Sequence, residues 1–121
     1  MATGHDLGRW GERVAERYLQ ARGWSVLARN FRDGPRELDL VVCRDGVTVF
    51  VEVKTRTGST ADALRGISRR KRGDLARAAA RWIHENRGSK GPFRFDVVTV
   101  KSCSGGAARV EHLTDAWRRD G

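Results

Sequence analysis

Two alternating segments separated by a short link constrain the fold of this chain more than any other feature. Residues 37–43 and 48–54 each alternate in the manner of a β-strand, and Arg44-Asp45-Gly46 joins them. An Asp-Gly pair in so short a connection favours a tight antiparallel hairpin. We therefore predict that these two strands are neighbours in a sheet.

The segments before this hairpin indicate a helix and a further strand. Residues 6–22 place apolar side chains at helical spacing, and Gly23 is typical of a residue that ends a helix. Residues 24–30 are typical of a strand and lead into a turn at Asp33-Gly34-Pro35. The residues on the predicted buried face of the helix are Leu7, Trp10, Gly11, Val14, Ala15, Tyr18 and Leu19.

The second half of the chain predicts a loop, a long helix and two strands. Residues 55–66 are polar and predict a mobile surface loop, while Ser68 is a good N-cap for a helix that extends to about Asn86, with Gly88 beyond it. Residues 93–100 predict a strong strand, residues 109–113 a weaker one, and the tail from Thr114 a short helix. The order α-β-β-β-α-β-β predicts an α/β or α+β domain with a mixed sheet flanked by helices.

Charge decides which class of partner the chain favours. The 121 residues (13.5 kDa) fit one domain spanning residues 1–121, and 24 Lys plus Arg against 15 Asp plus Glu give a net charge of +9. Such a surplus favours nucleic acid over an anionic membrane. No apolar run approaches the ~20 residues of a membrane helix, so we expect a cytoplasmic protein that is neither exported nor membrane-spanning.

Cys43 and Cys103 lack zinc-ligand spacing and are expected to be reduced, partly buried thiols.

The hairpin also carries the residues with the most distinctive chemistry. Alternation places Glu37 and Asp39 on one face of the first strand, with the leucines on the other. In the second strand Glu52 and Lys54 share a face with Phe50. If the polar faces coincide, three carboxylates and an ammonium converge, and a hard cation such as Mg²⁺ best relieves their repulsion. The alternative is an ordinary half-exposed sheet whose charged side chains form solvated ion pairs.

The spacing of these residues matches a known pattern. Glu37-Leu38-Asp39-Leu40, followed by Phe50-Val51-Glu52-Val53-Lys54-Thr55-Arg56, resembles the PD-(D/E)XK nuclease signature. Nearly the whole chain resembles the YraN-type family of small, basic bacterial proteins related to Holliday-junction resolvases. In that family a Gly precedes the Glu of the first strand, whereas this chain has Arg36. The other matching motifs are Gly11-Glu12, Ala15, Tyr18-Leu19, Arg29-Asn30-Phe31-Arg32 and Arg94-Phe95-Asp96-Val97-Val98.

This resemblance implies a restriction-endonuclease-like fold and a metal-dependent DNA endonuclease acting on branched or junction DNA. It implies that Asp39, Glu52 and the Val53 carbonyl hold Mg²⁺ or Mn²⁺, and that Lys54 orients the attacking water or stabilises the transition state. Glu12 and Glu37 are supporting residues; Glu12 is otherwise a surface acid and Glu37 a structural ion-pair partner. A homodimer is expected because junction cleavage needs two symmetric sites. The alternative function is a non-catalytic nucleic-acid-binding or ribosome-associated module.

A dense basic run marks the start and one side of the second long helix. It is interpreted as a surface that contacts the DNA backbone, with little sequence readout; the alternative is a solvated charged face. Arg69, Arg70 and Lys71 are expected to contribute most. Trp24, Phe31 and Trp82 are assigned to core packing, and Trp117 remains a candidate for base stacking. The residues of the run are Arg65, Arg69, Arg70, Lys71, Arg72, Arg77 and Arg81.

Overall fold

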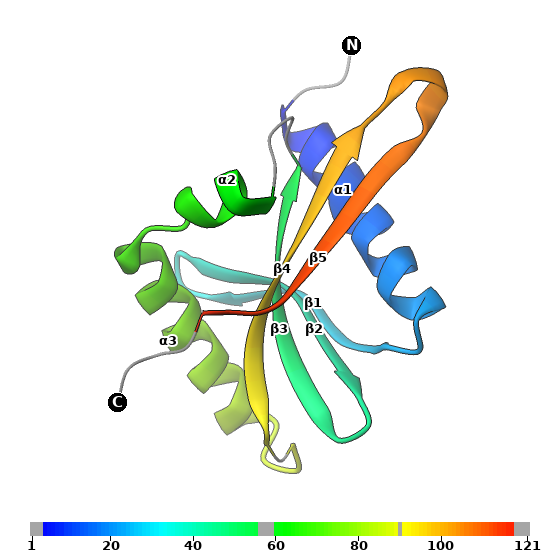
Figure 1. The fold of residues 1–121 in the computed structure, drawn as a ribbon. Coiled ribbons are helices and arrows are strands. Elements are labelled where there is room, and N and C mark those ends of the chain that lie inside the picture. Colours follow the sequence, from blue (N-terminus) through cyan, green and yellow to red (C-terminus); the bar gives the residue numbers. More distant parts are fainter. Residues whose placement is uncertain (1–3, 56–59, 90, 118–121) are drawn as a thin grey trace.

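Five strands form one mixed sheet in the computed structural model, which describes residues 4–55, 60–89 and 91–117. The strands lie in the order β1-β2-β3-β4-β5; β3 and β4 are parallel, and the other neighbours are antiparallel. The parallel pair requires a crossover, which α2 and α3 provide (Figure 1). The elements are α1 Gly4–Ala21, β1 Ser25–Asp33, β2 Arg36–Arg44, β3 Val47–Thr55, α2 Thr60–Arg65, α3 Arg69–Glu85, β4 Phe93–Ser102, the 3₁₀ helix η1 Ser104–Gly106 and β5 Ala108–Trp117.

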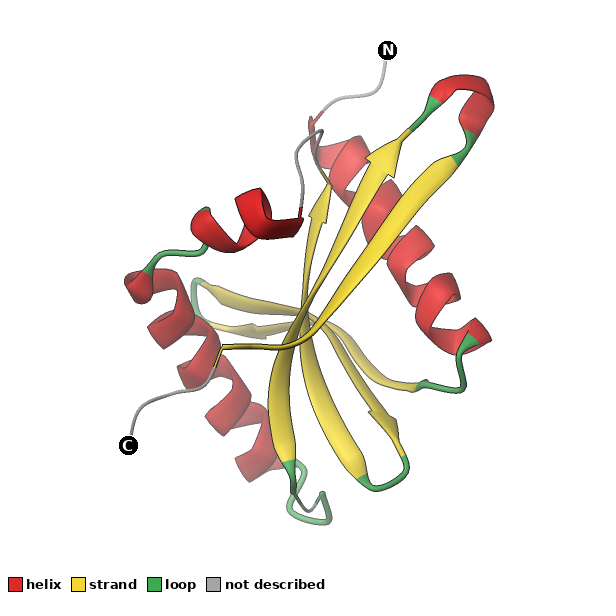
Figure 2. Ribbon diagram, in the orientation of Figure 1, coloured by secondary structure: helices red, strands yellow, loops and turns green. Residues whose placement is uncertain are grey.

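The helices cover opposite faces of the sheet, with α1 on one side and α2 and α3 on the other (Figure 2). The α1-side core joins Ala15 and Leu19 to strand residues that include Val49. The α3-side core joins Trp82 and other residues of α3 to strand residues that include Phe50. Both faces are therefore buried, which explains why the central strands are rich in β-branched apolar residues.

The sheet divides at the point where β2 leaves β3. The β2–β3 ladder runs only from Leu40 opposite Val51 to Arg44 opposite Val47. On the N-terminal side of Leu40, β2 pairs only with β1 among the described strands. On the C-terminal side of Val51, β3 pairs only with β4 among them. We call this divergence, formed by residues 36–39 of β2 and 52–55 of β3, the fork. In Figure 1 the β1–β2 turn and the end of β3 extend in different directions from it.

The predicted hairpin and helix boundaries are confirmed. Asp45 and Gly46 have φ values of 50° and 79°, as a two-residue turn of this type requires. Ser68 caps α3, its side chain accepting a hydrogen bond from the Lys71 N–H at 3.1 Å, and the helix ends at Glu85 with Asn86 as its C-cap. The predicted element order is also confirmed, with α2 in addition.

Two predictions about local structure are wrong. The polar stretch 55–66 is not all loop, because residues 60–65 form α2; residues 56–59 lie outside the described part. The tail from Thr114 is not a helix, because β5 continues to Trp117. Its pairing with β4 shifts register between Phe95 and Val97, and Asp115 has a φ of 53°. This irregularity resembles a strand end in the sequence, yet the strand resumes beyond it.

The close approach of α1 to the end of β3 yields a prediction about Gly11. A Cβ at residue 11 would overlap Oγ1 of Thr55 and lie 3.1 Å from its Cβ, whereas a Cβ at Gly8 meets nothing within 4 Å. We expect Gly11→Val to lower the free energy of unfolding by about 1–3 kcal/mol through overpacking. The matched variant Gly8→Val should change it by less than about 0.5 kcal/mol. Urea denaturation of both variants measures the difference, and equal stabilities would show that α1 does not need a glycine there.

Candidate active site

Three carboxylates from three parts of the chain meet beside the fork. Glu12 lies on α1, and Glu37 and Asp39 lie two residues apart on β2, so the predicted shared face of the latter two is confirmed. One oxygen atom of each residue lies within 4.8 Å of the other two. Glu12 is thus more than a surface acid, because the fold carries it from the first helix to the strand acids.

Asn30 connects two members of this group, and sequence reasoning assigned it no role. Its Nδ2 donates hydrogen bonds to Oε1 of Glu12 at 2.7 Å and to Oε1 of Glu37 at 2.8 Å. The residue has a φ of 48°, a conformation that asparagine tolerates better than most residues. The only sequence signal was its position inside the Arg29-Asn30-Phe31-Arg32 motif.

Glu37 forms the structural ion pair considered for it and also lies in the group of carboxylates. Its Oε2 pairs with Nη2 of Arg32 at 3.0 Å, while its Oε1 belongs to the group of carboxylates. Arg36, which directly precedes Glu37, pairs at 3.4–3.5 Å with Asp33 and with Asp74 of α3. It therefore ties the β1–β2 turn to α3 without turning Glu37 away from the group.

Glu52 and Lys54 reach the fork from the other side of the sheet. Val51 and Val53 belong to the α1-side core and Phe50 to the α3-side core, so alternation places Glu52 and Lys54 on the α3 side. Nζ of Lys54 lies 3.7 Å from Oε1 of Glu52, whose side chain is only 7% exposed. Their predicted shared face is confirmed.

Asp39 links the two sides because no β2–β3 ladder separates them at the fork. Its Oδ2 accepts the Val53 N–H at 2.8 Å, and its carboxyl also hydrogen-bonds to Glu52. The convergence of the acids expected across the hairpin is therefore present, whereas the common face predicted for the leucines is wrong: Leu38 packs in the α3-side core and Leu40 in the α1-side core. The acids converge through the division of the sheet.

Burial and charge together disfavour ionised acids at the fork. Burial raises the pKa of Asp39, and the carboxylates of Glu52, Glu12 and Glu37 raise it further, to about 8, against the opposing Val53 N–H. Burial also raises the pKa of Glu52, although the cations of Lys71 and Lys54 oppose that rise. Without a cation, the pair therefore holds a proton near neutral pH.

The donors at the fork suit a hard divalent cation. Glu12, Glu37, Asp39 and Glu52 offer carboxylate oxygens there, which Mg²⁺ and Mn²⁺ prefer over nitrogen or sulfur. Oε2 of Glu52 is buried and, among the described residues, has no hydrogen-bond partner. A buried carboxylate oxygen is costly unless it is paired, so this atom is suited to ligate a cation.

Some cations of the basic run contact acids or an aromatic ring of the protein, and others are exposed to solvent. Arg65 pairs with Asp62, Arg81 with Asp33 and Glu85, and the guanidinium of Arg72 lies 5.6 Å from the ring centre of Trp117. Arg69, Arg70 and Arg77 are exposed. Lys71 is half-buried at the first turn of α3, where its charge acts on Glu52.

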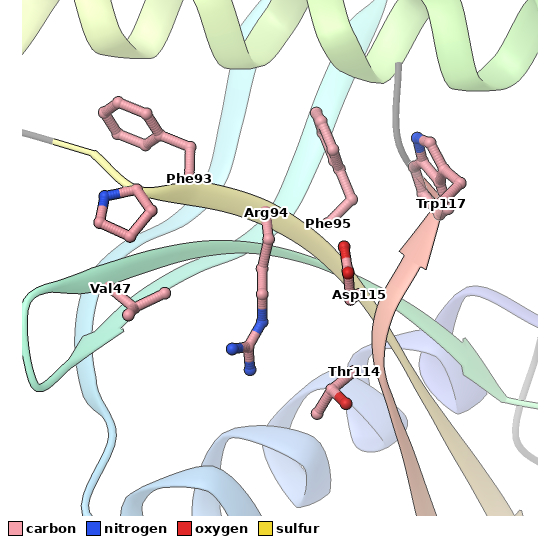
Figure 3. A pocket seen from close by; sticks show the side chains of 8 residues that line it. Val47, Phe93, Arg94, Phe95, Thr114, Asp115 and Trp117 are labelled. Atoms are coloured by element: carbon pink, nitrogen blue, oxygen red, sulfur yellow. The ribbon is translucent and has the colours of Figure 1, made fainter. Parts of the chain in front are cut away.

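A hollow of about 540 Å³ lies at the opposite end of β3 from the fork (Figure 3). Phe93, Phe95 and Trp117 lie on its α3 side, and Arg94 points the other way. Trp117 is 8% exposed and stacks on Phe95 at 5.1 Å, so it is a core residue, as Trp24 and Trp82 are; Phe31 packs against the α3-side core. The hollow contains none of the predicted site residues.

Of the two free cysteines, Cys43 is half-buried and Cys103 is exposed, so Cys103 is not the partly buried thiol that was predicted.

The divided sheet and the acids at the fork define an α/β domain of the restriction-endonuclease-like class. Residues 11–100 match the model of a family described as "Uncharacterised protein family UPF0102". The chain belongs to this family, and its predicted YraN-type membership is confirmed. None of the described helices is both long enough and apolar enough to cross a membrane.

Individual relatives resemble the chain over most of its length. It is 48% identical over 116 residues to a UPF0102 protein of Frankia alni, covering 92% of this chain and 93% of that protein. It is 49% identical over 112 residues to a UPF0102 protein of Beutenbergia cavernae, covering 88% and 92%. A UPF0102 protein of Syntrophotalea carbinolica is 40% identical over 116 residues, covering 95% and 94%.

Proposed function

We propose that this protein is a metal-dependent DNA endonuclease whose active site is the fork. The observation that carries the proposal is Asp39, which joins Glu52 and the Val53 N–H on one side to Glu12 and Glu37 on the other. A group of half-buried and buried acids, in which the pKa values of Asp39 and Glu52 are raised and Oε2 of Glu52 has no partner among the described residues, is costly for a folded protein. Such a cost is typical of a catalytic centre.

The side chains at the fork have separable roles in this proposal. Asp39 and Glu52, with the Val53 carbonyl, hold Mg²⁺ or Mn²⁺, and Glu12 and Glu37 support the cation from the α1 side. When bound, the cation lowers the pKa of a water molecule and neutralises charge on the scissile phosphate. Lys54 contributes an ammonium beside Glu52, where it orients the water or stabilises the transition state.

The DNA is proposed to approach across the start of α3. Arg69, Arg70 and Lys71 stand at the first turn of that helix, and Lys71 faces the fork. They contact backbone phosphates without reading bases, which suits substrates recognised by shape, such as branched DNA. Arg77 extends this surface along α3, while Arg65 and Arg72 stand at its edges. We also propose that the protein acts in the cytoplasm and that two copies form a two-fold symmetric dimer.

A non-catalytic nucleic-acid-binding module is the competing proposal, and the positive charge fits it equally well. The acids at the fork weigh against it, because carboxylates near a DNA path repel phosphates unless a cation lies between them.

Cleavage of a panel of DNAs tests the activity. Duplex, flap and four-way-junction DNAs are incubated with Mg²⁺, Mn²⁺ or EDTA. We expect metal-dependent cutting by the wild type and a loss of at least about 10²-fold in Asp39→Ala, Glu52→Ala and Lys54→Ala, because each removes a group that acts at the phosphate. Glu85→Ala, an exposed α3 acid away from the fork, should cut at the wild-type rate. DNA binding without cutting of any substrate would favour the binding module.

A further inference from the structure

A small hollow beside the fork is lined by cations from α1 and β1. Arg9 and Arg13, one turn apart on α1, and Arg29 of β1 line a space of about 200 Å³. The other lining residues are Glu12, Glu16, Asn30 and Leu40. We call this space the α1 hollow. Glu12 and Asn30 also belong to the hydrogen-bonded group that reaches Glu37, so the hollow adjoins the acids at the fork directly. The basic run of α3 is not part of it.

The cations of the α1 hollow are available to an anion. Within the described part of the chain, neither Arg9 nor Arg13 lies within ion-pair distance of an acid, and both are exposed. Arg29 is fixed by Glu16, which accepts hydrogen bonds from its Nε at 2.5 Å and its Nη2 at 2.9 Å. A guanidinium has five N–H donors, so Arg29 keeps donors free while its plane is held in place.

The size and position of the hollow limit its occupant. Pockets for whole small molecules typically measure about 300–1,000 Å³. A space of about 200 Å³ instead suits one group of a larger ligand. Arginine donors match phosphate oxygens in geometry and charge. Because phosphates repeat along a DNA strand, a strand with one phosphate at the fork brings another past the neighbouring surface.

We propose that the α1 hollow binds a second phosphate of the DNA strand that is cut at the fork. The inference rests on the proposed nuclease function and adds a contact on the side of the fork opposite to α3. With contacts at both α1 and α3, the strand is held on either side of the acids. Glu16, which also lines the hollow, holds the guanidinium of Arg29 in place in this arrangement.

Binding of short flap and junction DNAs in EDTA, where the DNA stays intact, tests the proposal. We expect Arg9→Gln/Arg13→Gln to bind about 5- to 50-fold more weakly and to lower the slope of log K against log salt by about 1–2. Arg17→Gln/Arg87→Gln removes the same charge from exposed positions outside the hollow, and its slope should stay within about 0.5 of the wild type. Arg69→Ala/Arg70→Ala provides the comparison for the α3 surface.

Neutral methylphosphonates, placed one at a time along the strand, locate the phosphate. We expect one position whose neutralisation weakens binding by wild type but not by Arg9→Gln/Arg13→Gln. Paired DNAs with a 5′-phosphate or a 5′-hydroxyl show whether that group is a terminal phosphate or an internal diester. If the double variant matches its control and no such position exists, the hollow does not bind phosphate. Metal-dependent cutting by the same wild-type protein would then leave the nuclease proposal standing, whereas absence of both DNA binding and cutting would overturn both.

Discussion

Replacing Asp96 by asparagine is expected to lower the free energy of unfolding by about 3 kcal/mol, because it breaks an ionic network centred on a fully buried carboxylate. The carboxylate is 0% exposed and accepts four hydrogen bonds. Arg94 donates from Nε at 2.9 Å and Nη2 at 3.1 Å, the Asp115 N–H donates at 2.8 Å, and Nε2 of His112 lies at 2.7 Å. An asparagine has one acceptor oxygen, so its NH₂ group must face a donor.

The cost falls on the whole sheet because Asp96 holds β5 at its irregular point. Asp115, with its φ of 53°, lies where the β4–β5 register shifts, and its N–H is satisfied by the Asp96 side chain. An asparagine that places its NH₂ group where this oxygen was leaves the Asp115 N–H without an acceptor, and the last residues of β5, including Trp117, then lose the contact that returns them to the sheet. Urea denaturation at pH 7 measures the effect.

Asp74→Asn is the matched control, because that acid is 39% exposed and pairs with Arg36 at 3.4 Å. Ion pairs of this kind contribute up to about 1 kcal/mol. Similar losses in the two variants would show that the Asp96 network contributes no more than a surface pair.

Lowering the pH should remove the stabilisation that the ionised Asp96 contributes to this network. Burial alone would raise the pKa of Asp96, but hydrogen bonds from His112, Arg94 and the Asp115 N–H outweigh it and hold the pKa below the ordinary value of 3.8. The stabilisation from this ionisation is therefore present above about pH 4 and is lost as pH falls through the lower folded pKa. The difference between wild type and Asp96→Asn should shrink in that range.

Most of the fold could be predicted from sequence because the local signals agree with one another. The Asp45-Gly46 turn, the Ser68 cap and the apolar stripe of α1 each specify a local structure that tertiary packing then preserves. Asp39, Glu52 and Lys54 were proposed as site residues from their match to the nuclease signature, and folding keeps Glu37 beside Asp39 and Glu52 beside Lys54, as their i, i+2 spacing predicts.

The parts that could not be predicted depend on contacts distant in sequence. Alternation assumes a continuous ladder, so it could not show that β2 residues before Leu40 separate from β3 or that Leu38 and Leu40 face different cores. Asn30 acquires its position only when α1 packs beside the β1–β2 hairpin. The turn chemistry at Thr114 and Asp115 favoured the end of a strand, but the buried Asp96 lets β5 continue.

Replacing Asp39 by asparagine is expected to stabilise the metal-free protein and to abolish its response to metal. The substituted amide can still accept the Val53 N–H and donate to Glu52, but it carries no charge to repel the acids around it. The difference between an ordinary pKa of 3.8 and a folded pKa of about 8 is equivalent to about 6 kcal/mol if taken whole. Water entry and relaxation reduce such values, so we expect a gain of about 1–2 kcal/mol at pH 8.

The sign of the pH dependence separates this gain from an ordinary improvement in packing. A carboxyl whose folded pKa is raised costs nothing below pH 3.8, and its cost grows as pH rises toward 8. The melting temperature of Asp39→Asn should therefore exceed that of wild type by an amount that is small at pH 4.5, increases to about pH 8 and then levels off. Glu85→Gln, an exposed acid on α3, should show no such increase.

Metal connects the stability of the fork to its proposed chemistry. A cation that binds the ionised acids displaces the proton held there, so Mg²⁺ or Mn²⁺ should raise the melting temperature of wild type more at pH 8 than at pH 6. At 100 times the dissociation constant the gain corresponds to about 2.7 kcal/mol, and Asp39→Asn should lose most of it. If Asp39→Asn is no more stable than wild type at pH 8 without metal, the acids at the fork do not repel one another. If it responds fully to metal, Asp39 is not a ligand.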